Sequence, residues 1–115
     1  MTPEALSDLV NNALEEIKGR DIVTLPVADL TDIADYMVIA GGTSNRHVKS
    51  LVDQVVKAVK DSGQRVLGVE GRETHEWVLV DAGDVIVHVM RAETRAFYEL
   101  ERLWAEIPSD SETLM

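Results

Sequence analysis

The chain has 115 residues, no cysteine and 45% hydrophobic residues, a composition typical of one globular domain with its own core. Its 21 acidic and 11 basic residues give a net charge of −10, which argues against a broad electrostatic contact with nucleic acid. A basic protein is the partner that such a surface suits, although a merely solvated acidic surface is the simpler interpretation. The lack of cysteine excludes disulfides and thiolate sites, and no apolar run is long enough for a membrane span.

The first residues are acidic and amphipathic, unlike a signal or transit peptide, so a soluble cytoplasmic protein is expected. Thr2 and Pro3 are a typical N-cap and first residue of a helix, an apolar stripe at helical spacing follows, and Gly19 is a candidate C-cap. Residues 21–27 favour a strand. Because Pro26 removes a ladder donor, that strand is expected at a sheet edge or to end there.

The middle of the chain alternates strand and helix signals. Residues 35–40 form a strongly apolar run, which is typical of a strand inside a sheet covered on both faces. A helix with a valine stripe is predicted from 45 to 62, with Gly63 as its stop, and 65–69 favours a short strand. This strand–helix–strand piece fits a right-handed parallel crossover.

Two runs rich in β-branched residues, Trp77–Val80 and Val85–Met90, flank a Gly-containing turn signal and predict a β-hairpin. A two-residue loop at 82–83 would place Trp77 opposite His88. One face of the hairpin then carries only valines. The other face is mixed and carries Trp77, Leu79, Ile86, His88 and Met90. This mixed face must be covered either by the chain's own helix or by a partner.

After Met90 the apolar period becomes helical, with Phe97, Leu100 and Trp104 on one side. The whole pattern predicts a single α/β domain, with a mixed sheet of about five strands and helices on both faces. The domain is expected to cover residues 1–105, followed by a flexible C-terminal tail at 106–115.

The loop Gly41-Gly42-Thr43-Ser44 precedes a helix N-terminus, where backbone amides can hold an anion. No complete phosphate-loop motif is present, so a tight turn with a Thr or Ser cap is the favoured interpretation. Gly-Thr-Ser also resembles the opening motif of nucleotidyltransferases. The next strand lacks their D-x-D carboxylate pair, and Asp81 and Asp84 are separated by a turn. Metal-dependent nucleotidyl transfer is therefore not expected.

The histidines, His47, His75 and His88, show no metal-ligand spacing and no arrangement that indicates nucleophilic catalysis. The sequence therefore predicts no metal, no cofactor and no catalytic residue. His88, on the mixed face near Trp77, is expected to be hydrogen-bonded or stacked.

A cationic stripe with one aromatic residue is expected on the last helix, at Arg95, Tyr98 and Arg102. It is either a solvated face with pairs such as Arg95 and Glu99, or an interface, since Tyr and Arg are frequent in binding hot spots. The sequence leaves both alternatives open.

Three stretches closely resemble the ribosomal silencing factor (Iojap) family: GTSNRHVKSL, GVEG, and WVLVDAGDVIVHVM followed by RAFYELERLW. The likeness runs from about Leu6 to Trp104, and Gly41 and Asn45 stand where Thr and Ser are more usual. The resemblance implies a nucleotidyltransferase-like fold without the catalytic carboxylates. It also implies a non-enzymatic protein that binds large-subunit ribosomal protein fourteen on the subunit-joining face. Such binding blocks subunit association and represses translation under nutrient limitation, and homodimers are implied as well.

We therefore expect an anti-association factor that binds neither DNA nor membranes. Its candidate partner-binding residues are Trp77, His88, Met90, Tyr98, Glu70, Glu76, Asp84 and Arg95. The alternative is a catalytically reduced nucleotidyltransferase-like domain that binds a nucleotide at residues 42–47. Binding of ATP or GTP to the pure protein distinguishes the two functions.

Overall fold

Residues 1–94 are the part of the chain that this computed structural model describes. Their elements are, in chain order, α1 (Pro3–Glu16), β1 (Arg20–Pro26), β2 (Tyr36–Gly42), α2 (Asn45–Asp61), β3 (Gly68–Glu70), β4 (Trp77–Asp81) and β5 (Val85–Arg91). The strands form one sheet in the order β1-β2-β5-β4-β3, in which β2 and β5 are parallel and the other neighbours are antiparallel. The predicted α/β fold with a mixed sheet is thus confirmed, and β1 is an edge strand, as its proline indicated.

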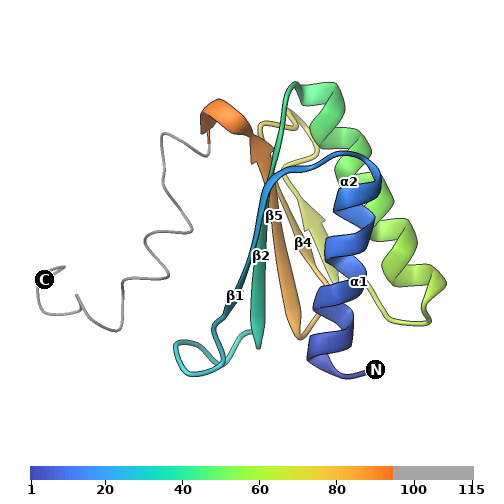
Figure 1. The fold of residues 1–115 in the computed structure, drawn as a ribbon, viewed down its shortest axis with the longest axis vertical. Coiled ribbons are helices and arrows are strands. Elements are labelled where there is room, and N and C mark those ends of the chain that lie inside the picture. Colours follow the sequence, from blue (N-terminus) through green and yellow to red (C-terminus); the bar gives the residue numbers. More distant parts are fainter. Residues whose placement is uncertain (95–115) are drawn as a thin grey trace, which may run out of the picture.

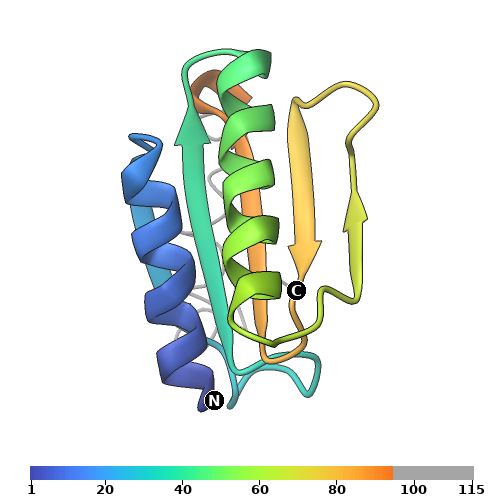
Figure 2. The same ribbon diagram turned by 90° about the vertical axis from the view of Figure 1, so that its right-hand side faces the viewer.

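Both described helices cover the same face of the sheet (Figures 1 and 2). Their apolar stripes meet the valine face of the hairpin, and the side chains in this main core include Leu6, Val10, Leu14, Val38, Val48, Leu51, Val55, Val78, Val80, Val87 and Val89. The many valines of α2 are therefore held by tertiary packing, which offsets their low helix propensity. The helix expected on the opposite face falls almost entirely beyond residue 94, outside the described residues.

The helix ends follow local capping chemistry. Thr2 accepts a 3.0 Å hydrogen bond from the amide of Ala5 at the start of α1, as predicted. At its other end the left-handed conformation is taken by Lys18, with φ of 60°, rather than by the expected Gly19. The amide of Gly19 instead closes the turn by donating to the carbonyl of Leu14 at 2.8 Å.

The crossover prediction is correct in direction and wrong in adjacency. Successive pairings make β3 parallel to β2, but β5 and β4 lie between them. The third strand also begins later than predicted, at Gly68. Leu67, just before it, donates its amide to the carbonyl of Asp81 at 2.7 Å.

The hairpin has the predicted partners in a different register. Trp77 lies opposite Met90, and Leu79 lies opposite His88, so the predicted pairing of Trp77 with His88 is wrong by two positions. An even shift leaves every side chain on its predicted face, because side chains alternate with a period of two. The valine face and the mixed face are therefore as predicted.

The register differs because the turn lies one residue later than predicted. Ala82 donates to the carbonyl of Val85 at 3.0 Å, so the loop residues are Gly83 and Asp84. Gly83 has φ of 87°, a conformation that favours glycine, and its amide donates to the carboxylate of Asp81 at 2.9 Å. This side-chain bond fixes the later turn.

Candidate functional site

The sheet face opposite the helices has a second, smaller apolar cluster. Its buried members are Val27, Met37, Ile39 and Met90, with Leu25, Leu30 and Trp77 packed around them. The mixed face of the hairpin therefore continues across β2 and into the segment after β1. It forms one apolar surface, which we call the second face.

Trp77 and His88 are joined on this second face. The indole Nε1 of Trp77 donates a 3.0 Å hydrogen bond to Nδ1 of His88, and the two rings are tilted at 59° with centroids 6.0 Å apart. His88 is only 8% exposed, whereas Trp77 is half-buried. The prediction that His88 is hydrogen-bonded or stacked is confirmed.

The protonation state of His88 follows from its burial. Burial disfavours the charged imidazolium and lowers the pKa of His88 from 6.5 to about 4. At neutral pH the ring is therefore uncharged, and its Nδ1 accepts the indole proton. The polar atom of Trp77 is satisfied within the protein, so the part of the indole that remains exposed is apolar.

The loop before β4 holds Trp77 in place through close backbone contacts. Gly71 has φ of 95°, and a Cβ at this position would overlap the carbonyl oxygen of Trp77. His75, with φ of 58°, donates its amide to the carbonyl of Gly71 at 3.1 Å. The amide of Arg91 donates to the carbonyl of Glu76 at 3.1 Å, which ties the loop to the end of β5.

The three candidate acidic residues do not lie together. Glu70 is exposed and pairs with Leu79, so it shares the second face. Glu76 is exposed and directly precedes Trp77. Asp84 is also exposed but lies in the β4–β5 turn at the other end of the sheet. Glu70 and Glu76 can therefore rim a surface around Trp77, and Asp84 cannot.

The loop suggested for nucleotide binding is held by its own side chains. Ser44 accepts the amide of His47 at 3.1 Å, as an N-cap of α2. Nδ1 of His47 accepts a 2.9 Å hydrogen bond from the amide of Thr43. Nε2 of the same ring lies 2.7 Å from the carbonyl oxygen of Ile17, so Nε2 is the nitrogen that carries the proton. These amides are thus already paired, as expected for a capped turn.

The glycine of this loop has a packing role. A Cβ on Gly42 would lie 2.8 Å from a methyl group of Val48, so glycine is needed for the close approach of β2 to α2. Within residues 1–94, no group of three His, Asp or Glu side chains is placed to hold a metal ion. Asp81, one of the two carboxylates weighed for catalysis, accepts the amide of Gly83.

Comparisons with known proteins match almost the whole chain. A sequence model described as "Ribosomal silencing factor during starvation" matches residues 1–114. A Chromobacterium violaceum protein named ribosomal silencing factor RsfS is 47% identical over 104 residues, which cover 90% of this chain and 85% of that protein. The chain belongs to the ribosomal silencing factor family.

Other known proteins extend the similarity. A crystal structure of a Chromobacterium violaceum protein has a TM-score of 0.89 and 47% identity, and covers 91% of this chain and 88% of that one. A mouse protein named mitochondrial assembly of ribosomal large subunit protein 1 is 37% identical over 100 residues, which cover 84% of this chain and 44% of that protein. The family resemblance inferred from the sequence motifs is confirmed.

The structure places some of the predicted partner-binding residues on one face of the sheet. Trp77, His88 and Met90 share the second face, with Glu70 and Glu76 at its rim. Tyr98 and Arg95 lie outside the described residues. Within the described part of the chain, no helix has the length and apolarity needed to cross a membrane.

The second face also contains residues that sequence reasoning did not select. Met37 and Ile39 of β2 and Val27 pack with Met90, but only the pairing of β2 with β5 brings them there. The available signal was alternation. Met37 and Ile39 alternate with Val38 in an apolar run, so one of the two sets had to face away from the helices.

Proposed function

We propose that this silencing factor binds ribosomal protein fourteen of the large subunit on the subunit-joining face. Bound there, it sterically blocks association with the small subunit and represses translation under nutrient limitation. Family membership supports this proposal, because the matching family is described as acting during starvation. The mouse relative supports the choice of target, since its name places it in assembly of the large ribosomal subunit.

The observation that carries the proposal is the half-buried indole of Trp77 on the second face. Tryptophan is frequent among residues that dominate binding energy, because it offers a large and rigid apolar area. The bond from Trp77 to His88 leaves no unpaired indole donor to be desolvated on binding. Glu70 and Glu76 add negative charge around the anchor, which suits a basic ribosomal protein.

The proposed action is non-enzymatic, since a steric block requires only binding. It takes place in the cytoplasm, where the subunits join. Homodimer formation, which the family resemblance implies, remains part of this proposal. Nucleotide binding at residues 42–47 is less well supported, because amides of that loop are paired with Ser44 and His47.

Sedimentation with isolated ribosomal particles tests the proposal. The purified protein is mixed with large subunits, small subunits or intact ribosomes and separated on a sucrose gradient. We expect co-sedimentation with large subunits alone, and less intact ribosome when small subunits are added afterwards. Equal binding to small subunits or to intact ribosomes would contradict a block at the joining face.

A further inference from the structure

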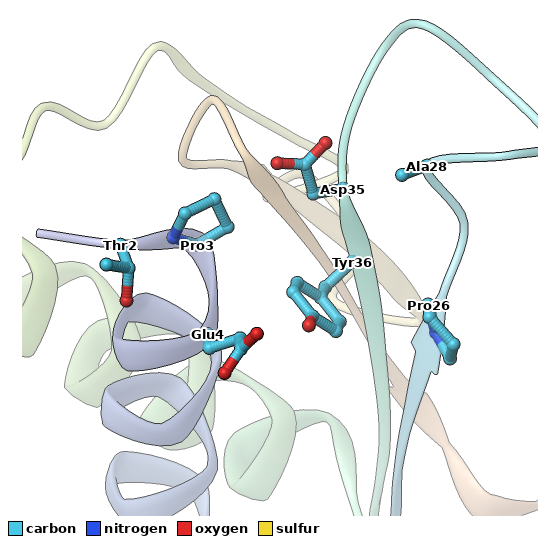
Figure 3. Close-up of a pocket in the computed structure, with 7 residues that line it drawn as sticks. All are labelled: Thr2, Pro3, Glu4, Pro26, Ala28, Asp35 and Tyr36. Atoms are coloured by element: carbon cyan, nitrogen blue, oxygen red, sulfur yellow. The ribbon is translucent and has the colours of Figure 1, made fainter.

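A hollow of about 370 Å³ lies where α1 begins, β1 ends and β2 begins (Figure 3). The residues that line it are Thr2, Pro3, Glu4, Pro26, Ala28, Asp35 and Tyr36. Its volume is at the small end of the range for pockets that hold ligands, about 300–1,000 Å³. The hollow is large enough for one side chain of a partner.

The wall of the hollow is aromatic and apolar. Figure 3 shows the ring of Tyr36 at its centre, between Glu4 of α1 and Pro26 of β1. Pro3, Pro26 and Ala28 add apolar surface around this half-buried ring. None of the hydrogen bonds found among residues 1–94 uses the Tyr36 hydroxyl.

The rim of the hollow is negatively charged. Glu4 and Asp35 line it, and Asp8 lies one turn beyond Glu4 on the same side of α1. Partial burial, together with the charges of Glu4, Asp35 and Asp8, raises the pKa of Tyr36 above its usual value. In the described part of the chain, the ion pairs involve other carboxylates and leave these three without a cationic partner.

An anion is not the expected occupant, although a helix N-terminus favours anions in general. The amide of Ala5 donates to the Thr2 hydroxyl and that of Leu6 donates to the Thr2 carbonyl, each at 3.0 Å. Pro3 has no amide hydrogen to offer. The surrounding carboxylates would in addition repel a phosphate or sulfate.

We propose that this hollow receives a lysine or arginine side chain from a basic segment of a partner protein. The methylene stem of such a side chain packs along the Tyr36 ring and the two prolines, and its charged head reaches the carboxylates of Glu4 and Asp35. The ring face of Tyr36 adds a cation–π attraction. The net charge of −10 favours approach of a basic segment.

A side chain of a protein fits this hollow better than a free small amine. Glu4, Pro26 and Ala28 are exposed, so the hollow is open to solvent and offers few contacts to a small molecule. A free amine loses its translational and rotational freedom for those few contacts. When a partner protein is already held by other contacts, its translational and rotational freedom has been lost. Insertion of one of its side chains into the hollow then carries no further loss of this kind.

The hollow is separate from the second face. Along β2, Tyr36 pairs with Val85, whereas Gly41 pairs with Met90, the residue opposite Trp77. These two positions are about 17 Å apart by the rise of a strand. Tyr36 also packs on the helix side of the sheet and Trp77 on the other side. The proposal therefore adds a second contact surface to the one proposed for the ribosome.

The test uses a pentapeptide with one central arginine, blocked at both ends, and its citrulline counterpart, which is nearly isosteric and uncharged. Amide chemical shifts of the full chain are followed as each peptide is added. The arginine peptide is expected to shift the amide signals of residues 2, 4, 35 and 36, with much smaller shifts from the citrulline peptide. Shifts centred elsewhere, or equal shifts from both peptides, would overturn the proposal.

Variants separate a specific site from general attraction. Glu4→Gln combined with Asp35→Asn should weaken binding of the arginine peptide about tenfold. The matched control is Glu15→Gln with Glu73→Gln, which changes net charge equally at exposed acids elsewhere and should stay within about twofold of the unmodified protein. If the control pair lost as much affinity for the arginine peptide, general charge attraction would explain the binding and the proposed site would be refuted. Spermidine binding at the hollow as tightly as the peptide would refute a protein side chain as the occupant.

Discussion

The bond from Trp77 to His88 runs diagonally across the hairpin, since His88 lies opposite Leu79 and Trp77 lies opposite Met90. It links a half-buried aromatic ring, the proposed anchor, to a histidine that is only 8% exposed. Trp77 therefore contributes to the packing of the second face and, in the proposed function, to the surface that binds a partner. The sequence treated these two roles as alternatives.

Replacement of Trp77 by alanine separates the two roles. A residue that served only as an exposed anchor could be replaced with an almost unchanged thermal midpoint. The structure instead predicts a measurable loss of stability, because His88 Nδ1 loses its donor. We expect a loss of about 1–3 kcal/mol in the free energy of unfolding. Binding to the large-subunit protein should weaken by about 2 kcal/mol or more, which is about thirtyfold. A thermal melt and a pull-down of the same variant measure the two effects.

The matched control is Leu67→Ala, which removes an apolar side chain that is 60% exposed and outside the second-face cluster. It should leave binding unchanged. Trp77→Phe retains an aromatic ring but lacks the donor, so it should lose stability and keep more of the binding. If Trp77→Ala binds as well as the unmodified protein, the binding surface lies elsewhere.

The buried imidazole predicts a loss of stability in mild acid. His88 has a pKa of about 4 in the fold and 6.5 as the ordinary value, so the unfolded chain binds its proton first as pH falls. The neutral His88 ring contributes fully to the free energy of unfolding above about pH 6.5. About 3 kcal/mol of that free energy is lost as pH falls towards 4. Urea unfolding at a series of pH values measures this slope.

The control for this pH dependence is His88→Gln, which retains hydrogen-bonding capacity and does not titrate. All other ionisable groups are common to both proteins, so the difference between the two stability curves isolates His88. The advantage of the unmodified protein over the variant should shrink between pH 6.5 and 4. If the difference in unfolding free energy between the two proteins stayed constant across this range, burial in the fold would not lower the pKa of His88.

The local elements of this fold could be predicted because their signals are local. The helix predicted at 45–62 is found at Asn45–Asp61, since Ser44 and Gly63 provide the cap and the stop. The hairpin register could not be predicted, because 82–83 and 83–84 both satisfy the chemistry of a turn. A single bond from Gly83 to the Asp81 side chain decides between them.

The long-range pairings could not be predicted, because they depend on contacts between distant parts of the chain. The insertion of β5 beside β2 brings Met37 and Ile39 to Met90, and no local pattern contains that information. That Trp77 and His88 share one face of the hairpin could be predicted even though the register was wrong. Any even shift of register keeps those two side chains on one face.

Two glycines with positive φ give a matched pair of substitutions. Gly71→Ala adds a Cβ that overlaps the carbonyl oxygen of Trp77, whereas Gly63→Ala, at a similar φ, meets no atom within 4 Å. Gly63→Ala should lose about 1–2 kcal/mol from backbone strain alone. Gly71→Ala should lose at least about 1–3 kcal/mol more from the overlap. Chemical denaturation measures both, and equal losses would contradict the role assigned to Gly71.

The amides of Thr43 and His47 are paired with side chains of the 42–47 loop, which predicts weak or no nucleotide binding. Titration calorimetry with ATP or GTP and Mg²⁺ should detect no saturable binding, and no nucleotidyl transfer should occur with Mg²⁺ or Mn²⁺. Ser44→Ala, which removes the cap of α2, should cost about 1 kcal/mol of stability without changing this result. Reproducible turnover that disappears in Asp84→Ala would contradict a binding-only protein.

The acidic rim around Trp77 predicts how salt acts on association. Charges at the edge of an interface mainly accelerate encounter, so added salt should lower the on-rate more than it raises the off-rate. Glu70→Gln with Glu76→Gln should lower the on-rate several-fold and weaken its salt dependence, because both residues lie at the Trp77 end of the sheet. Asp84→Asn is the control, because Asp84 lies in the turn at the other end and should leave the on-rate nearly unchanged. Surface plasmon resonance with immobilised ribosomal protein at several salt concentrations measures these rates.

If the on-rate did not change with salt, charge complementarity would play no part in the proposed mode of binding. A larger effect from Asp84→Asn than from the Glu70 and Glu76 pair would move the contact away from Trp77.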